Sequence, residues 1–173
     1  ENFALGYVST VVGGYDNTAA SPRTLVSGGI SNFVEGYASH IGGGHTNTVY
    51  APYTLIAGGD GNRAVGYSHS ITGGQFNTIV GDHWSKIAGG ISNTIADGNY
   101  GLILGGKNNL VASDVGIVSG GAYNTAGAYT YIGGGFYNSV GSMGTVVGGI
   151  TNIATASYVS VGGGFQHTVS GVY

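Results

Sequence analysis

The sequence has no cysteine, two prolines and few charges among its 173 residues. Without cysteine there is no disulfide, no thiolate nucleophile and no zinc–sulfur site. Charged residues make up 6% of the chain, with four Lys plus Arg and a formal net charge of −3, so the basic footprint that electrostatic nucleic-acid binding needs is missing. No apolar run approaches the ~20 residues that span a bilayer. We therefore expect neither a nucleic-acid partner nor a membrane span.

Glycine, by contrast, is abundant, with 37 residues, and it marks an internal repeat. A Gly-Gly pair recurs every 14 to 16 residues, and its second members are Gly14, Gly29, Gly44, Gly59, Gly74, Gly90, Gly106, Gly121, Gly135, Gly149 and Gly164. An asparagine follows three residues later in ten of the eleven units, namely Asn17, Asn32, Asn47, Asn62, Asn77, Asn93, Asn109, Asn124, Asn138 and Asn152. His167 takes the eleventh position. Such a fixed period is the signature of a repeat architecture.

Apolar residues flank these positions with a period of two. Val or Ile always stands two residues before the glycine pair, and Ala, Val or Ile always stands two residues after the asparagine position. Alternation of this kind predicts strands, and ~15 residues have room for two short strands and two turns. Helical repeats need ~34 residues or more. The sequence predicts an all-β parallel β-solenoid, or β-roll, of about eleven rungs at ~15 residues and two short strands per rung.

The repeated positions predict structural roles. Glycine allows a sharp turn and close approach of two backbones, and stacked asparagines can hydrogen-bond as a ladder from rung to rung. We expect one repeat domain over residues 1–173, uncapped at both ends, as in a piece of a longer fibre.

Two stretches carry a family resemblance. Residues 9–19, Ser-Thr-Val-Val-Gly-Gly-Tyr-Asp-Asn-Thr-Ala, and residues 53–68 resemble the head repeats of trimeric autotransporter adhesins and related phage and virus fibre repeats. The doubled glycine, the asparagine after it and the period of 15 differ from the ~14-residue unit of that family. The resemblance implies a left-handed parallel β-roll, three chains packed side by side, and an exposed module that adheres to a host or matrix ligand.

The outward positions of the predicted strands are too apolar for a solitary rod. We expect a homo-oligomer, either a trimer, as the resemblance implies, or an end-to-end filament. The larger aliphatic side chains occur on the strand before the glycine pair, and we assign the interface to Leu25, Leu55, Leu102, Leu104 and Ile117.

Aromatic residues recur at one predicted turn. Six residues before the second glycine stand Tyr53, Trp84, Tyr100, Tyr129 and Tyr158, and one residue earlier stand Tyr7, Tyr37 and Tyr67. Both 16-residue units carry their additional residue at this turn, near Trp84 and Tyr100. Exposed aromatic side chains on a rigid edge suit stacking on sugars or anchoring a protein. We therefore assign ligand binding to the first five residues, while packing along the solenoid edge is the structural alternative.

No catalytic or metal constellation is recognisable. The five histidines occupy different positions in the repeat, and asparagine stands where calcium-binding roll repeats carry aspartate. His45 and Asp60 share a position on neighbouring rungs, which predicts an exposed ion pair. We expect no enzyme, no cofactor and no metal site.

Taken together, these patterns indicate an extracellular surface adhesin or fibre module that binds a host, matrix or glycan ligand. A structural subunit of a self-assembling extracellular filament is the alternative. A weaker alternative is an ice-binding solenoid, because threonine recurs after the asparagine; Phe33, Arg63, Leu110 and Ile153 interrupt that row.

Overall fold

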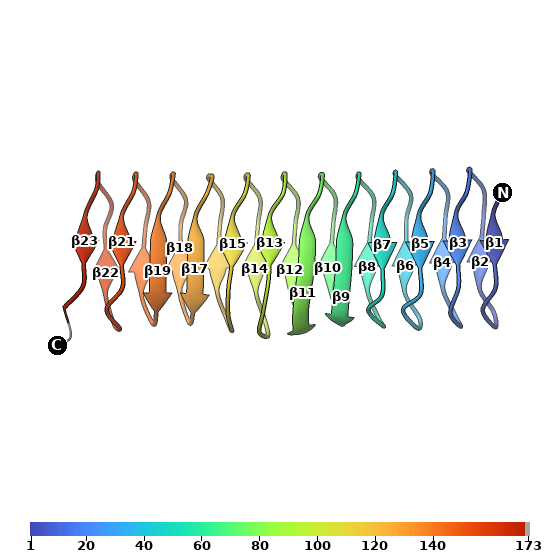
Figure 1. Ribbon diagram of the computed structural model, residues 1–173, viewed down its shortest axis with the longest axis horizontal. Coiled ribbons are helices and arrows are strands. Elements are labelled where there is room, and N and C mark those ends of the chain that lie inside the picture. The colour runs from blue at the N-terminus through green and yellow to red at the C-terminus, as the bar shows by residue number, and fades with distance from the viewer. Residues whose placement is uncertain (172–173) are drawn as a thin grey trace.

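The computed structural model is a straight rod of stacked coils, which confirms the predicted parallel β-solenoid (Figure 1). It describes residues 1–171, so the last two residues of the predicted 1–173 domain lie outside the described residues. Strands alternate between two parallel sheets, and each coil of roughly 15 residues contributes one strand to each sheet. Within residues 1–171 there is no helix, and hence none long and apolar enough to cross a membrane.

The 12-stranded sheet contains the strands that follow the asparagines: β1 (Phe3–Ala4), β3 (Thr18–Ala19), β5 (Phe33–Val34), β7 (Thr48–Val49), β9 (Arg63–Tyr67), β11 (Thr78–His83), β13 (Thr94–Ile95), β15 (Leu110–Val111), β17 (Thr125–Ala128), β19 (Ser139–Ser142), β21 (Ile153–Ala154) and β23 (Thr168–Val169). The 11-stranded sheet contains those that precede the glycine pairs: β2 (Thr10–Val11), β4 (Leu25–Val26), β6 (His40–Ile41), β8 (Leu55–Ile56), β10 (Ser70–Ile71), β12 (Lys86–Ile87), β14 (Leu102–Ile103), β16 (Ile117–Val118), β18 (Tyr131–Ile132), β20 (Thr145–Val146) and β22 (Ser160–Val161).

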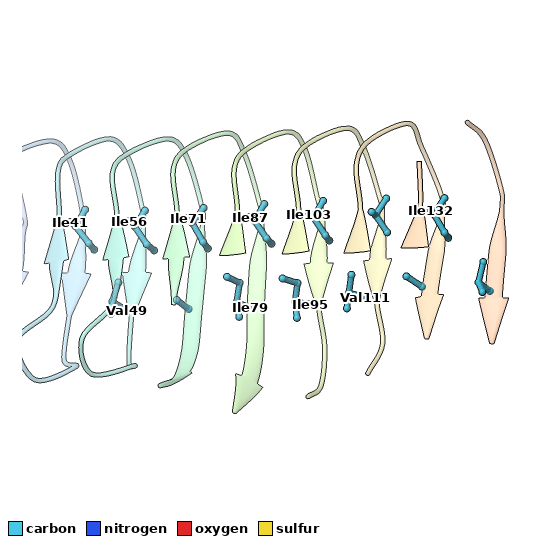
Figure 2. Packing of buried hydrophobic residues seen from close by; sticks show 14 of the residues in the cluster. Ile41, Val49, Ile56, Ile71, Ile79, Ile87, Ile95, Ile103, Val111 and Ile132 are labelled. Atoms are coloured by element: carbon cyan, nitrogen blue, oxygen red, sulfur yellow. The ribbon is translucent and has the colours of Figure 1, made fainter. Parts of the chain in front are cut away.

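The thin core is a double row of aliphatic side chains, as Figure 2 shows. One row comes from the 11-stranded sheet and includes Ile41, Ile56, Ile71, Ile87 and Ile103; the facing row comes from the 12-stranded sheet and includes Val49, Ile79, Ile95 and Val111. All of these side chains are fully buried. β-Branched residues suit this position because they pack closely on a pleated surface. Residues at the same position of successive repeats pair in register, for example Ile71 with Ile87.

A third column of paired residues, which the two-strand prediction lacked, runs along the turn after the glycine pairs. We call it the corner column; its members, joined by isolated parallel bridges, are Tyr15, Ile30, His45, Asp60, Gln75, Ile91, Lys107, Ala122, Phe136, Ile150 and Phe165. Single-residue bridging of this kind leaves no alternating pattern in the sequence. The predicted pair of His45 and Asp60 lies in this column, with Nδ1 and Oδ1 2.9 Å apart, and that hydrogen bond is the main cause of the lowered pKa of Asp60.

The asparagines form a continuous buried ladder inside the same turn. In each coil, the backbone N–H of the ladder residue donates to the Oδ1 of the asparagine one coil earlier, over 3.0–3.1 Å. The first such bond joins Asn17 to Asn2, and the last joins His167 to Asn152. The amide nitrogen also donates to two glycine carbonyls; Asn77 Nδ2, for example, lies 3.1 Å from Gly73 O and 3.0 Å from Gly90 O. The ladder therefore satisfies backbone groups that the tight turn removes from the sheets.

A second buried polar column lines the opposite turn and includes one histidine. Its hydrogen-bonded members are Ser39, Thr54, His69, Ser85 and Gly101. His69 is 2% exposed, and its Nδ1 lies 3.3 Å from the N–H of Ser85. Its Nε2 lies 3.2 Å from the carbonyl oxygen of Gly81, which can accept the single proton of a neutral ring, and 3.1 Å from the backbone nitrogen of Tyr67. A second proton would face the N–H of Ser85, and burial lowers the pKa of His69 below 6.5.

We expect acid to destabilise the rod partly through His69. Because its pKa is lower in the folded than in the unfolded chain, the unfolded chain binds the proton first as the pH falls below about 6.5. Stability from a neutral His69 is therefore present above this pH and declines below it. His69→Thr, which matches Thr54 in the same column, should flatten the decline in unfolding midpoint between pH 7 and pH 5.

His40 contributes with the same sign, since burial also lowers its pKa, so part of the decline should persist in His69→Thr. An unchanged slope in this variant would show that His69 is not a source of the acid sensitivity.

Candidate functional site: an aromatic ridge

Aromatic rings from successive coils meet along the turn between the 12-stranded and the 11-stranded sheet, at the lower edge in Figure 1, where β9 and β11 end. Neighbouring ring centroids lie 5.2–5.6 Å apart along this row. We call it the aromatic ridge; its members are Tyr37, Tyr53, Tyr67, His83, Trp84 and Tyr100. Trp84 and Tyr100 stack at an interplanar angle of 21°, and both are about half exposed.

Several ridge residues have a backbone conformation that L-residues rarely adopt. Tyr53, Trp84 and Tyr100 have φ values of 55°, 50° and 60°, in the left-handed region that glycine and asparagine favour. Each non-glycine residue there costs roughly 1–2 kcal/mol. The same conformation recurs at this turn position in coils that carry no aromatic residue there, for example at Arg23, Ala38 and Ser68. It is therefore a property of the solenoid turn, and the ridge is distinguished by its contacting rings.

The additional residue of the first 16-residue unit forms a local irregularity in the ridge. Pairing between β9 and β11 shifts register between Val80 and His83, and His83 then pairs with Tyr67. As a result, His83 and Trp84 both point outward as neighbours, with ring centroids 5.2 Å apart. Bulges recur where a side chain is directed toward a ligand.

Polar groups lie at both ends of the ridge. The Arg23 guanidinium lies 5.7 Å from the ring centroid of Tyr37. At the other end, His83 Nδ1 lies 3.1 Å from Asn99 Oδ1, and Asn99 Nδ2 donates to Asp114 Oδ1 over 3.2 Å. The ridge thus combines ring faces with hydrogen-bonding groups, the combination by which aromatic anchors and polar contacts together bind an exposed ligand.

Of the five predicted ligand residues, the structure brings Tyr53, Trp84 and Tyr100 into the ridge. Tyr129 and Tyr158 occupy the same turn and the same left-handed conformation, but Val115 and Met143 stand at this position on intervening coils. The ligand assignment left out Tyr37, Tyr67 and His83, as well as Arg23 beside the ridge. The one-residue insertion beside Trp84 could have indicated that His83 belongs to the ridge. Nothing in the sequence indicated that the Arg23 guanidinium lies against the ring of Tyr37.

The predicted interface residues lie on the outer face of the 11-stranded sheet but do not form one strip. Leu102 pairs with Ile117, and Leu104 lies beside them. His40 stands between Leu25 and Leu55 on the intervening strand. Ser70 and Lys86 stand between Leu55 and Leu102.

The described part of the chain encloses no pocket and brings together no group of three potential metal ligands. A ligand of the ridge would therefore lie along a convex edge and touch several coils at once. Extended ligands such as glycan chains or protein strands fit such an edge better than a small molecule does.

No protein-family model matches the chain, and a search of curated proteins finds no match.

Proposed function

We propose that the chain is a rigid binding module of an extracellular adhesin or fibre, which contacts an extended ligand through the aromatic ridge. Glycan chains are the first ligand class to test. The observation that carries the proposal is the row of exposed aromatic rings that contact one another from coil to coil, with a register shift beside Trp84. The resemblance to adhesin head repeats supports the extracellular assignment, and the left-handed coil and threefold assembly that it implies stay predictions.

We expect Trp84→Gly to weaken ligand binding by about 10- to 100-fold with little change in stability. An aromatic anchor at the centre of an interface contributes ~2 kcal/mol or more to binding. Stability should change by less than about 1 kcal/mol, because relief of left-handed strain offsets the lost ring stacking. A glycan array identifies the ligand, and titration calorimetry with the best glycan measures the loss.

Tyr129→Gly is the matched control, because it makes the same kind of change at the same turn position outside the ridge. This control variant should bind like the intact chain. Equal affinity of the intact chain and Trp84→Gly would remove the ridge from the site. Silence of the intact chain on the array, together with fibres under the electron microscope, would favour a structural filament.

A further inference from the structure

The corner column forms a second exposed edge, at the turn opposite the aromatic ridge. Ile30, Ile91 and Ile150 are 48%, 43% and 45% exposed. Rings from the adjoining turn position extend this apolar edge: Tyr123 and Tyr137 both contact Phe136, with centroids 5.6 Å and 4.4 Å away. No described residue covers these side chains, which are more apolar than an exposed edge requires.

Counted outward from Ile91, the corner column carries similar side chains at some levels and different ones at others. One step away on either side are the polar residues Gln75 and Lys107, and four steps away are Ile30 and Ile150. Three steps away the ion-paired His45 corresponds to the apolar ring of Phe136, and five steps away are the rings of Tyr15 and Phe165. At two steps, Asp60 corresponds to the small Ala122. In an antiparallel pair about a two-fold axis at Ile91, residue i meets residue j and j meets i, so Ile30 would meet Ile150, and Tyr15 would meet Phe165, as apolar contacts.

We propose that two copies of this chain pair antiparallel along the corner column, about a two-fold axis at Ile91. Because both copies have the same spacing between coils, every coil of one copy meets a coil of the other. Ile91 then meets itself, and Ile30 meets Ile150 of the second copy. The aromatic ridge remains free on the opposite turn, so the pairing and ligand binding are independent of each other.

The charges of this edge favour the antiparallel over a parallel arrangement. Asp16 and Asp60 lie on the N-terminal side of Ile91, while Lys107 lies on the C-terminal side. In a parallel pair Asp60 would face Asp60, and Lys107 would face Lys107. In the antiparallel pair, Lys107 of one copy faces Gln75 of the second copy. Asp60 of the second copy lies one coil further along, within reach of the lysine side chain. Like charges directly opposite one another are unfavourable, so the charge pattern selects the antiparallel pair.

The size of the edge predicts a weak pair. Ten steps of ~4.8 Å give a length of about 48 Å, and two side-chain columns offer on the order of 500 Å² per copy. The total is near the ~1,000 Å² at the lower limit for specific association. We therefore expect a dissociation constant in the micromolar range, and a concentration-dependent equilibrium between one and two copies in sedimentation equilibrium.

Ile91→Asp tests the position of the interface. Because Ile91 lies on the axis, the change places two carboxylates against each other and should weaken pairing at least 100-fold. Val80→Asp is the matched control: Val80 is similarly exposed, at 41%, but lies on the outer face of the 12-stranded sheet, and this variant should pair normally. Circular dichroism checks that both variants fold. Pairing that survives Ile91→Asp would overturn the proposal, as would an equal loss in Val80→Asp or a chain that stays single at 100 µM.

Single cysteines test the orientation, because the chain has none of its own. Ile91→Cys should form a disulfide-linked pair under mild oxidation. Ile30→Cys and Ile150→Cys should each stay unlinked when alone and link when mixed. In any parallel arrangement, including a threefold one, Ile30→Cys lies beside itself, so its linking alone would overturn the proposal.

A distance measurement gives the same information without an oxidant and with Ile91 intact. A spin label on Ile30→Cys should report about 40 Å between copies, because eight steps of ~4.8 Å separate the level of Ile30 from that of Ile150. A distance below about 20 Å would indicate a parallel arrangement and would contradict the antiparallel pair.

Discussion

Gly74→Ala is expected to destabilise the rod by about 4 kcal/mol or more, whereas Gly73→Ala should leave its stability nearly unchanged. Gly74 has a φ of +86°, and a Cβ there would overlap the carbonyl oxygen of Gly90 on the next coil and lie 2.7 Å from Asn77 Nδ2. Both the left-handed conformation and the contact between coils then oppose the side chain. Losses of this size arise where a substitution meets backbone that cannot move away.

Gly73 is a close control because it is the other member of the same pair. A Cβ there meets no atom within 4 Å, and its φ is not positive. Unfolding midpoints in denaturant should separate the two variants, and amide exchange should locate the opened coils around Gly74. Equal losses in the two variants would contradict the assignment of the second glycine as the packing position.

Asn77→Ala should cost about 3–5 kcal/mol. The change removes the Oδ1 that accepts the backbone N–H of Asn93 over 3.1 Å and its side-chain amide over 3.2 Å. It also removes the donor to the Gly73 and Gly90 carbonyls. A buried polar group left without a partner costs ~1–3 kcal/mol, and at least two such groups arise here. Denaturant unfolding followed by circular dichroism measures the loss.

Thr78→Ala is the control for Asn77→Ala, since Thr78 is the next residue and is half-buried on the outer face of β11. We expect a loss below about 1 kcal/mol there. Asn77→Asp keeps the acceptor but loses the amide donor, so a carboxylate would face two carbonyl oxygens. This variant should be destabilised at pH 7 and partly recover when the buried carboxyl binds a proton at lower pH. A mild effect of Asn77→Ala would mean that the ladder contributes little to the rod.

The sequence was sufficient for the solenoid because each coil repeats the same local constraints. The position of Ile71 and Ile87 holds Val or Ile in every unit, so its burial and register followed from the period alone. The asparagine positions were equally informative, because a polar residue repeated beside a buried strand requires a partner of its own kind in the neighbouring coil.

Features that depend on how neighbouring coils differ were not predictable. The ridge is continuous because Tyr37 and Tyr67 stand one residue earlier in their units than Tyr53, and ring directions decide which of them touch. The corner column rests on single-residue bridges between unlike side chains, such as Ile91 and Lys107. The corner column keeps no residue type from coil to coil, so periodicity carried no information about it. For the ridge, periodicity indicated the aromatic turn but not which rings touch.

The register shift beside His83 has a consequence for how many ligands one rod can hold. A perfectly regular rod would offer a ligand the same surroundings at every coil, and binding could begin at any level. The additional residue beside Trp84 shifts the strand register and places His83 against Trp84, and no other strand pair of the described residues shows such a shift. A chain-like ligand should therefore settle in one alignment on the rod, with a stoichiometry close to one ligand per copy.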